Sequence, residues 1–119
     1  MRSVSPGAES LLDIEVPVLD HGFVQPLDYM GKDEDIVQAA RVSYGPSTRQ
    51  KSDDRGLLRY LMWMRHTSPT EMCEVKFRMK MPIFVVRQII RTCTSNVNEM
   101  SLRYSEAPDV FYLPQSEQI

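Results

Sequence analysis

The feature that most constrains the fold is an alternating run from Cys73 to Met81 that leads directly into Pro82. The apolar members are Cys73, Val75, Phe77, Met79 and Met81, and the charged residues between them are Glu74, Lys76, Arg78 and Lys80. A strict period of two predicts a half-buried antiparallel strand. Proline is tolerated best in the first turn of a helix, so we expect a helix to begin near Pro82.

Two more helices are predicted from apolar residues at helical spacing. Residues 33–44 begin with three acidic residues, which suit the positive end of a helix dipole. The other helix is expected to follow Ser52, a residue type suited to the N-cap. It should end before Ser68-Pro69, since the residue before a proline avoids the helical region.

Residues 11–30 are expected to be extended with one turn, and residues 109–114 to form a last short strand. Antiparallel strands mixed with helices indicate an α+β fold, an antiparallel sheet packed with helices. Residues 1–10 hold Ser, Pro and Gly without periodicity, so we expect a flexible arm there and a single domain over residues 11–119.

Charge and cysteine content exclude several classes of protein. The net charge of −2 and the pI of about 5.6 give no basic field, so neither nucleic acid nor an anionic membrane is an expected partner. No apolar run approaches the roughly 18 residues of a membrane span. Cys73 and Cys93 form neither a disulfide framework nor a CxxC pair, so we expect a cytoplasmic protein without a metal site.

The predicted helix after Pro82 carries a narrow polar stripe. Apolar residues cover most of its circumference from Ile83 to Cys93, so the helix should be largely buried. Arg87, Gln88 and Arg91 stand at i, i+1 and i+4 against that background. Buried guanidinium groups need anionic partners. The partners are either the chain's own carboxylates or a ligand phosphate, which arginine can bind through two parallel hydrogen bonds.

Residues 94–105 follow this helix and are rich in hydroxyl and amide side chains. Such a loop can offer several hydrogen-bond donors to a phosphate or a base, while Glu99 can accept from a sugar hydroxyl. The alternative interpretation is a solvated turn without a ligand.

The segment from Arg87 to Ser105 resembles the motif R-H-R-x7-S-x-R of flavin-dependent thymidylate synthases, and the spacing is kept throughout. Other segments resemble the family in the same order: Leu19–Val24, Gln38–Tyr44, Asp54–Leu57, His66–Pro69 and Pro82–Val85. The resemblance covers roughly residues 19–114.

This resemblance implies a partial flavin-dependent thymidylate synthase-like domain of α+β fold. It also implies the reductive methylation of dUMP to dTMP with FAD as cofactor and with NADPH and methylenetetrahydrofolate as co-substrates. The family is homotetrameric, so a homo-oligomer is the expected assembly. Members of the family run to about twice this length, which predicts a fragment, a truncated gene product or a decayed copy.

The resemblance also assigns roles position by position. It implies dUMP contacts from Gln88, Ile89, Ile90, Arg91, Glu99, Met100, Ser101, Leu102 and Arg103. It implies FAD contacts from Ser43, Ser68, Arg91, Thr92, Cys93 and Glu99. The residues implied in catalysis are His66, Arg91 and Ser101.

Two motif positions depart from the family. Thr92 and Cys93 stand where the motif has histidine and arginine, both of which help to hold FAD in the family. We therefore expect weakened flavin binding. This departure supports one rival, a non-catalytic homologue that binds dUMP weakly or not at all. A second rival, a small nucleic-acid-binding module, conflicts with the acidic pI of about 5.6.

Overall fold

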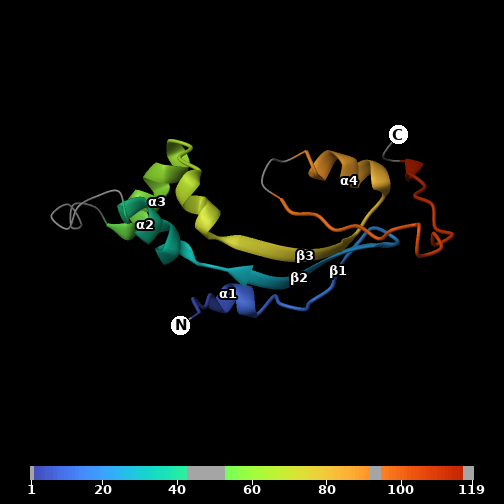
Figure 1. Cartoon of the computed structure of the whole chain (residues 1–119), viewed down its shortest axis with the longest axis horizontal. Coiled ribbons are helices and arrows are strands. Elements are labelled where there is room, and N and C mark those ends of the chain that lie inside the picture. Colours follow the sequence, from blue (N-terminus) through green and yellow to red (C-terminus); the bar gives the residue numbers. More distant parts are fainter. Residues whose placement is uncertain (1, 43–52, 92–94, 117–119) are drawn as a thin grey trace. The chain divides into compact units, whose positions relative to one another are not determined.

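The computed structural model describes residues 2–42, 53–91 and 95–116 (Figure 1). The elements are the helix α1 (Pro6–Glu9), the strands β1 (Val16–Val18) and β2 (Gly22–Met30), the helices α2 (Asp33–Val42) and α3 (Asp54–Trp63), the 3-10 helix η2 (Ser68–Met72), the strand β3 (Glu74–Lys80) and the helix α4 (Ile83–Ile89). The three strands form one antiparallel sheet in the order β1-β2-β3. The predicted α+β class is confirmed.

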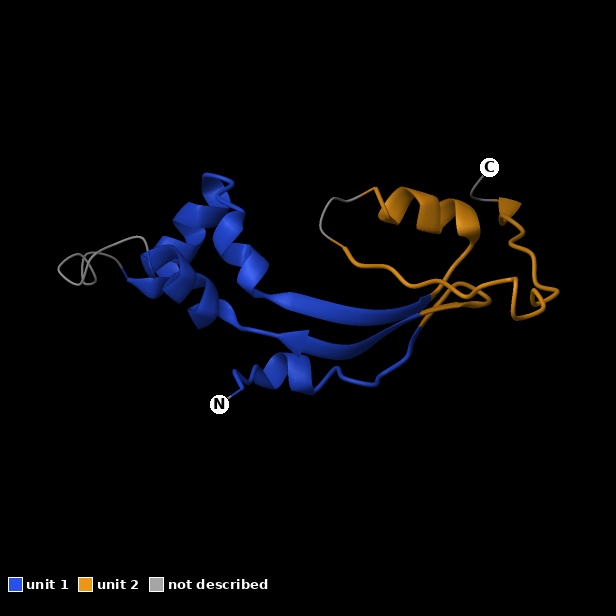
Figure 2. Cartoon of the chain, in the orientation of Figure 1, with its two compact units in different colours: residues 1–16, 24–79 blue, residues 17–23, 80–119 orange. Residues whose placement is uncertain are grey.

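The chain divides into two compact units (Figure 2). The first comprises residues 1–16 and 24–79, and it holds α1, α2, α3, η2 and most of β2 and β3. The second comprises residues 17–23 and 80–119, and it holds the turn between β1 and β2, the helix α4 and the C-terminal segment. A flexible arm over residues 1–10 and a single domain over residues 11–119 stay predictions.

The core of the first unit is small. The buried apolar side chains among the described residues are Tyr29, Val37 and Leu61. Val37 lies on α2, which contacts both α3 and η2. Arg41 Nη1 lies 2.6 Å from Asp54 Oδ1, so an ion pair also joins α2 to α3. The predicted acidic first turn of α2 is confirmed, and positions 43 and 44 of that predicted helix lie outside the described residues.

Gly31 makes the turn from β2 into α2 with a φ of +86°, a conformation that favours glycine. A Cβ atom at this position would lie 2.7 Å from Cys73 Sγ and 2.7 Å from the Met72 carbonyl oxygen. The backbone just before α2 therefore approaches the start of β3 too closely for any side chain.

Tyr29 joins the N-terminal segment to the sheet. The backbone amide of Ser5 donates to the Tyr29 hydroxyl at 2.8 Å, and this hydroxyl donates to Glu9 Oε1 at 2.7 Å. The guanidinium of Arg2 lies 4.9 Å from the centre of the Tyr29 ring and pairs with Glu9 Oε1 at 2.9 Å. These contacts hold α1 against one end of β2.

The alternating run forms β3 as predicted, but its predicted half-burial is wrong in this chain. All seven residues of Glu74–Lys80 are exposed, including Val75, Phe77 and Met79 at 55%, 47% and 43%. Half-burial requires a second layer over the apolar side of the sheet. Within the first unit, too little of the described chain packs over these three side chains to bury them.

The helix α4 starts directly after Pro82, as predicted, but none of its residues is buried. Ile83 and Phe84 are 68% and 56% exposed, so the expectation of a largely buried helix is wrong. Apolar side chains all around a helix need neighbours on every side. In the second unit, Tyr112 contacts α4 from the C-terminal segment, with its ring centre 5.5 Å from that of Phe84.

The predicted strand over residues 109–114 is wrong, since this segment has no regular secondary structure. A strand needs a neighbouring strand to pair its backbone groups, and the sheet in the described residues consists of β1, β2 and β3.

Candidate functional site

The polar stripe lies at the C-terminal end of α4. Arg87 and Gln88 are exposed residues of the last turn, and Arg91 follows in the turn after the helix. The backbone amide of Arg91 donates to the Gln88 carbonyl oxygen at 3.3 Å, which continues the helical path by one step. Cations at this end of a helix suit its dipole, so the stripe is locally stable without a ligand.

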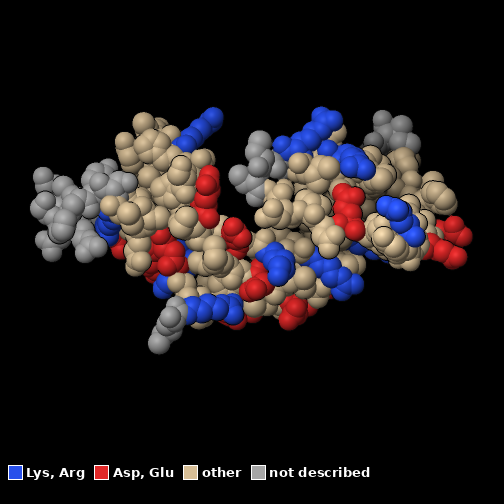
Figure 3. Space-filling view, viewed as in Figure 1, with Lys and Arg blue, Asp and Glu red and all other residues tan. Residues whose placement is uncertain are grey.

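The arginines of this region differ in their partners. Within the described part of the chain, ion pairs are formed by Arg2, Lys32 and Arg41. Arg87 and Arg103 have no ion-pair partner among the described residues, whereas Arg91 does make an interaction within the chain. Basic side chains are visible on the surface where α4 lies (Figure 3). Arg87 and Arg103 are therefore available to an external anion.

The loop after α4 turns at Ser101. The backbone amide of Arg103 donates to Ser101 Oγ at 3.3 Å, and the amide of Tyr104 donates to the Ser101 carbonyl oxygen at 3.2 Å. The hydroxyl of Ser101 keeps its own proton for donation. Glu99, Ser101 and Arg103 are exposed, so the loop presents these polar groups to solvent, and the apolar side chains of Met100 and Leu102 are exposed beside them.

The structure places the predicted site residues in two groups. The predicted dUMP contacts Gln88, Ile89, Ile90, Arg91, Glu99, Met100, Ser101, Leu102 and Arg103 all lie in the second unit. His66 and Ser68 lie in the first unit. Ser43, Thr92 and Cys93, which the resemblance assigns to FAD, lie outside the described residues.

His66 and Ser68 occupy the connection from α3 to β3. The His66 ring is exposed and meets the ring of Tyr60 edge to face, with 6.2 Å between the ring centres. Ser68 is the first residue of η2 and is exposed. Both side chains are accessible, which a role beside a ligand requires.

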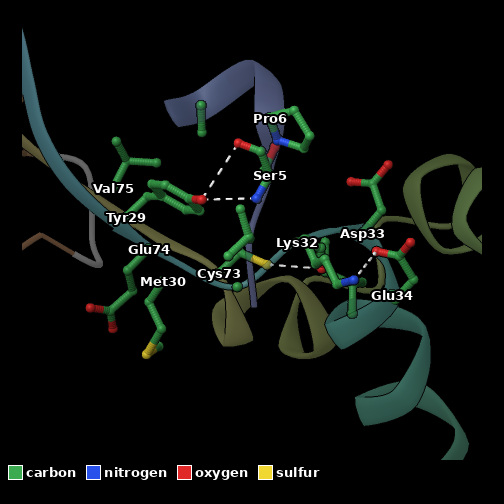
Figure 4. Close-up of a pocket in the computed structure, with 14 residues that line it drawn as sticks. Ser5, Pro6, Tyr29, Met30, Lys32, Asp33, Glu34, Cys73, Glu74 and Val75 are labelled. Atoms are coloured by element: carbon green, nitrogen blue, oxygen red, sulfur yellow. Dashed lines mark hydrogen bonds and ion pairs between the residues drawn. The ribbon is translucent and has the colours of Figure 1, made fainter. Parts of the chain in front are cut away.

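Sequence patterns did not predict a shallow cavity of about 450 Å³ in the first unit (Figure 4). Tyr29, Lys32 and Cys73 are among the residues that line it. The thiol of Cys73 donates to the Lys32 carbonyl oxygen at 3.5 Å. Burial, followed by the charges of Asp35 and Asp33, raises the pKa of this thiol. A raised pKa lowers the fraction of the thiol that is present as thiolate, the nucleophilic form.

The described residues contain no group of three or more His, Cys, Asp or Glu side chains placed to hold a metal ion. In the same part of the chain, no helix has the length and apolar character that crossing a membrane requires.

An antiparallel sheet, a helix with an arginine in its last turn and a hydroxyl-rich loop define an α+β protein with a candidate anion site. Residues 26–118 match the family model described as thymidylate synthase complementing protein. The chain therefore belongs to this family.

Similar proteins in two bacteria carry the name flavin-dependent thymidylate synthase. The chain is 54% identical to the one from Wolbachia pipientis wMel over 118 residues, which are 99% of this chain and 42% of that protein. It is 56% identical to the one from Ruegeria pomeroyi, of which it covers 39%. The chain thus spans about two fifths of the length of these relatives.

The structure is also similar to the crystal structure of PolB, a UMP/dUMP methylase from Streptomyces cacaoi bound with 5-Br dUMP. The TM-score is 0.70 and the sequence identity is 39%, with 82% of this chain and 43% of that chain covered. A sequence identity of 39% supports a shared family as well as a shared fold.

Proposed function

We propose that this chain carries the dUMP-binding part of a flavin-dependent thymidylate synthase. The overall reaction would be the reductive methylation of dUMP to dTMP, with FAD as cofactor and NADPH and methylenetetrahydrofolate as co-substrates. The observation that carries the proposal is the 39% identity and the TM-score of 0.70 to a methylase bound with a dUMP analogue. We further propose a cytoplasmic homotetramer, as the family resemblance implies.

The residues of the second unit suit a uridine nucleotide. Arg87 and Arg103 are cations without ion-pair partners in the described residues, and a guanidinium can bind a phosphate through two hydrogen bonds. Of the two interpretations of the polar stripe, a ligand phosphate is thus supported for Arg87. We assign phosphate and base contacts to residues 88–91 and 99–103, with Ser101 donating its hydroxyl and Glu99 accepting a hydrogen bond.

The described residues provide fewer suitable contacts for FAD than for dUMP. The described residues assigned to FAD are Ser68, Arg91 and Glu99, which together offer one hydroxyl, one cation and one carboxylate. A cofactor with two phosphates attracts cations and repels a carboxylate. Bound flavin would supply the redox chemistry of the methylation, and His66, Arg91 and Ser101 are the residues proposed to orient the reactants. The residues assigned to dUMP include two cations, Arg91 and Arg103, whereas the described residues assigned to FAD include one, so the described residues suit dUMP better than FAD.

The first experiment is calorimetry of dUMP binding to the chain. We expect Arg103→Ala and Arg91→Ala each to weaken binding by about 1.5–3 kcal/mol, the scale of hydrogen bonds to charged groups. The matched control is Arg59→Ala, which removes an exposed arginine from α3 in the other unit and should leave dUMP binding unchanged. Absence of any binding heat at millimolar dUMP would reject the proposed nucleotide site.

A second candidate is a non-catalytic homologue that binds dUMP weakly or not at all. Thr92 and Cys93 favour it, because they replace the histidine and arginine of the family motif. Turnover measurements with FAD, NADPH, methylenetetrahydrofolate and dUMP separate the two candidates. Calorimetric dUMP binding without turnover supports a binder, and dTMP formation supports the enzyme.

A further inference from the structure

Phe84 lies on the same face of α4 as the polar stripe. It is the second residue of the helix, and Arg87 and Gln88 follow it at i+3 and i+4. Residues at these spacings are neighbours on a helix surface. Arg91 stands at i+7, and its backbone amide continues the helical path by donating to the Gln88 carbonyl oxygen. The stripe therefore has an aromatic side chain at its N-terminal end.

Tyr112 brings the C-terminal segment back to this face of α4. The ring centres of Phe84 and Tyr112 are 5.5 Å apart, and the ring planes meet at 62°. Aromatic pairs prefer such edge-to-face arrangements. The chain that leaves the C-terminal end of α4 thus returns to the first turn of the same helix (Figure 1). The hydroxyl-rich loop lies between these two points, so α4 holds both of its ends.

The loop itself offers little packing that would fix its position. Residues 95–116 are exposed throughout. Within this segment Tyr112 is 39% exposed, whereas Phe111 and Leu113 on either side of it are 80% and 79% exposed. Of these three neighbours, Tyr112 is therefore the one that packs on the rest of the second unit.

We propose that Phe84 and Tyr112 are positioning residues, whose ring contact holds the loop of residues 95–105 beside α4 in the arrangement that binds dUMP. Neither ring needs to touch the nucleotide. A free loop loses conformational entropy when a ligand orders it, and this cost weakens binding. A contact that already restrains the loop lowers that cost. The inference rests on the proposed function, which assigns nucleotide contacts to residues 99–103.

The test is calorimetry of dUMP binding to the 119-residue chain and to its Phe84→Ala variant. Removal of the ring should weaken dUMP binding by roughly two- to tenfold, the range that an edge-to-face aromatic pair contributes. Phe84→Tyr keeps the ring and should bind dUMP as the unsubstituted chain does. The matched control is Ile83→Ala, at the preceding position of α4, where the side chain is 68% exposed. This control should leave dUMP binding unchanged.

The partner ring provides an independent variant. Tyr112→Ala removes the same pair together with a further interaction that Tyr112 makes within the chain. The double variant of Phe84→Ala and Tyr112→Ala should therefore bind dUMP no more weakly than Tyr112→Ala alone, because the pair is already lost. Phe111→Ala is the control for this position. Should circular dichroism show that Phe84→Ala is unfolded, the comparison of Tyr112→Ala with Phe111→Ala decides.

A measurement without nucleotide separates positioning from a general loss of stability. Backbone NMR order parameters of residues 99–103 should fall in Phe84→Ala and stay unchanged in Ile83→Ala. If the unsubstituted chain binds dUMP and Phe84→Ala binds it equally well, this inference alone is overturned. Equal losses of affinity in Phe84→Ala and Ile83→Ala also overturn it. Absence of dUMP binding to the unsubstituted chain rejects the proposed nucleotide site and this inference with it.

Discussion

Gly31 combines a left-handed backbone conformation with a close approach of neighbouring backbone, so it tolerates substitution poorly. Its φ of +86° disfavours any side chain, and so does the distance of only 2.7 Å that would separate an added Cβ from Cys73 Sγ. We expect Gly31→Ala to lower the free energy of unfolding by about 1–3 kcal/mol, measured by urea denaturation.

The control for Gly31 is Gly7→Ala. Gly7 lies in α1 with nothing within 4 Å of the added Cβ, so alanine there should stabilise by about 0.5–1 kcal/mol. Equal effects of the two substitutions would contradict the steric argument.

Cys73 should titrate above the ordinary range of a thiol, because burial and then the charges of Asp35 and Asp33 raise its pKa. A folded-state pKa above the unfolded value stabilises the fold at low pH, and this contribution is lost as pH rises through the folded pKa. In a Cys93→Ser background, the pH profile of alkylation should have its midpoint above that of free cysteine. Asp35→Asn should lower the midpoint, and a wild-type midpoint at or below that of free cysteine would contradict the assignment.

At the scale of elements, the Tyr29 hydroxyl makes two of the hydrogen bonds that attach α1 to β2. Tyr29→Phe removes the acceptor of the Ser5 amide and a donor to Glu9 while keeping the buried ring. We expect a loss of about 1–3 kcal/mol in the free energy of unfolding. Amide exchange at Ser5 should accelerate in the same variant. Fast exchange at Ser5 in the unsubstituted chain would instead support the predicted flexible arm.

The control for this attachment is Tyr60→Phe, at a tyrosine that is 53% exposed on α3. Surface substitutions of this kind usually change stability by less than about 0.5 kcal/mol. A comparable loss in both variants would show that the Tyr29 hydroxyl has no special role.

The elements that the sequence predicted correctly are those with local causes. The period of two in β3 and the position of Pro82 before α4 depend on neighbouring residues alone, and both predictions are confirmed. The predicted burial of Phe77 and Ile83 is wrong because burial depends on layers that come from elsewhere in a fold. Likewise, helical spacing selected Arg87 and Arg91 but could not reveal which cations pair with carboxylates of the chain.

At the scale of the whole molecule, the two motif positions that depart from the family bear on flavin binding. The family resemblance implies that a histidine and an arginine of the motif contact FAD, and this chain has Thr92 and Cys93 at those positions. Replacement of an arginine removes a positive charge and up to five donors. Replacement of a histidine removes a ring that could lie against the cofactor. Among the described residues assigned to FAD, the side-chain donors that remain are those of Ser68 and Arg91.

These losses predict that the 119-residue chain purifies colourless and lacks thymidylate synthase turnover. If each lost contact contributes about 1.5–3 kcal/mol, the two departures together weaken FAD binding by about 3–6 kcal/mol. This corresponds to a loss of roughly two to four orders of magnitude in affinity. Thr92→His with Cys93→Arg should restore part of this affinity in a flavin titration. Thr94→Arg, which adds a cation one position later, is the control and should not. A yellow preparation of the unsubstituted chain with stoichiometric FAD would mean that other groups hold the flavin.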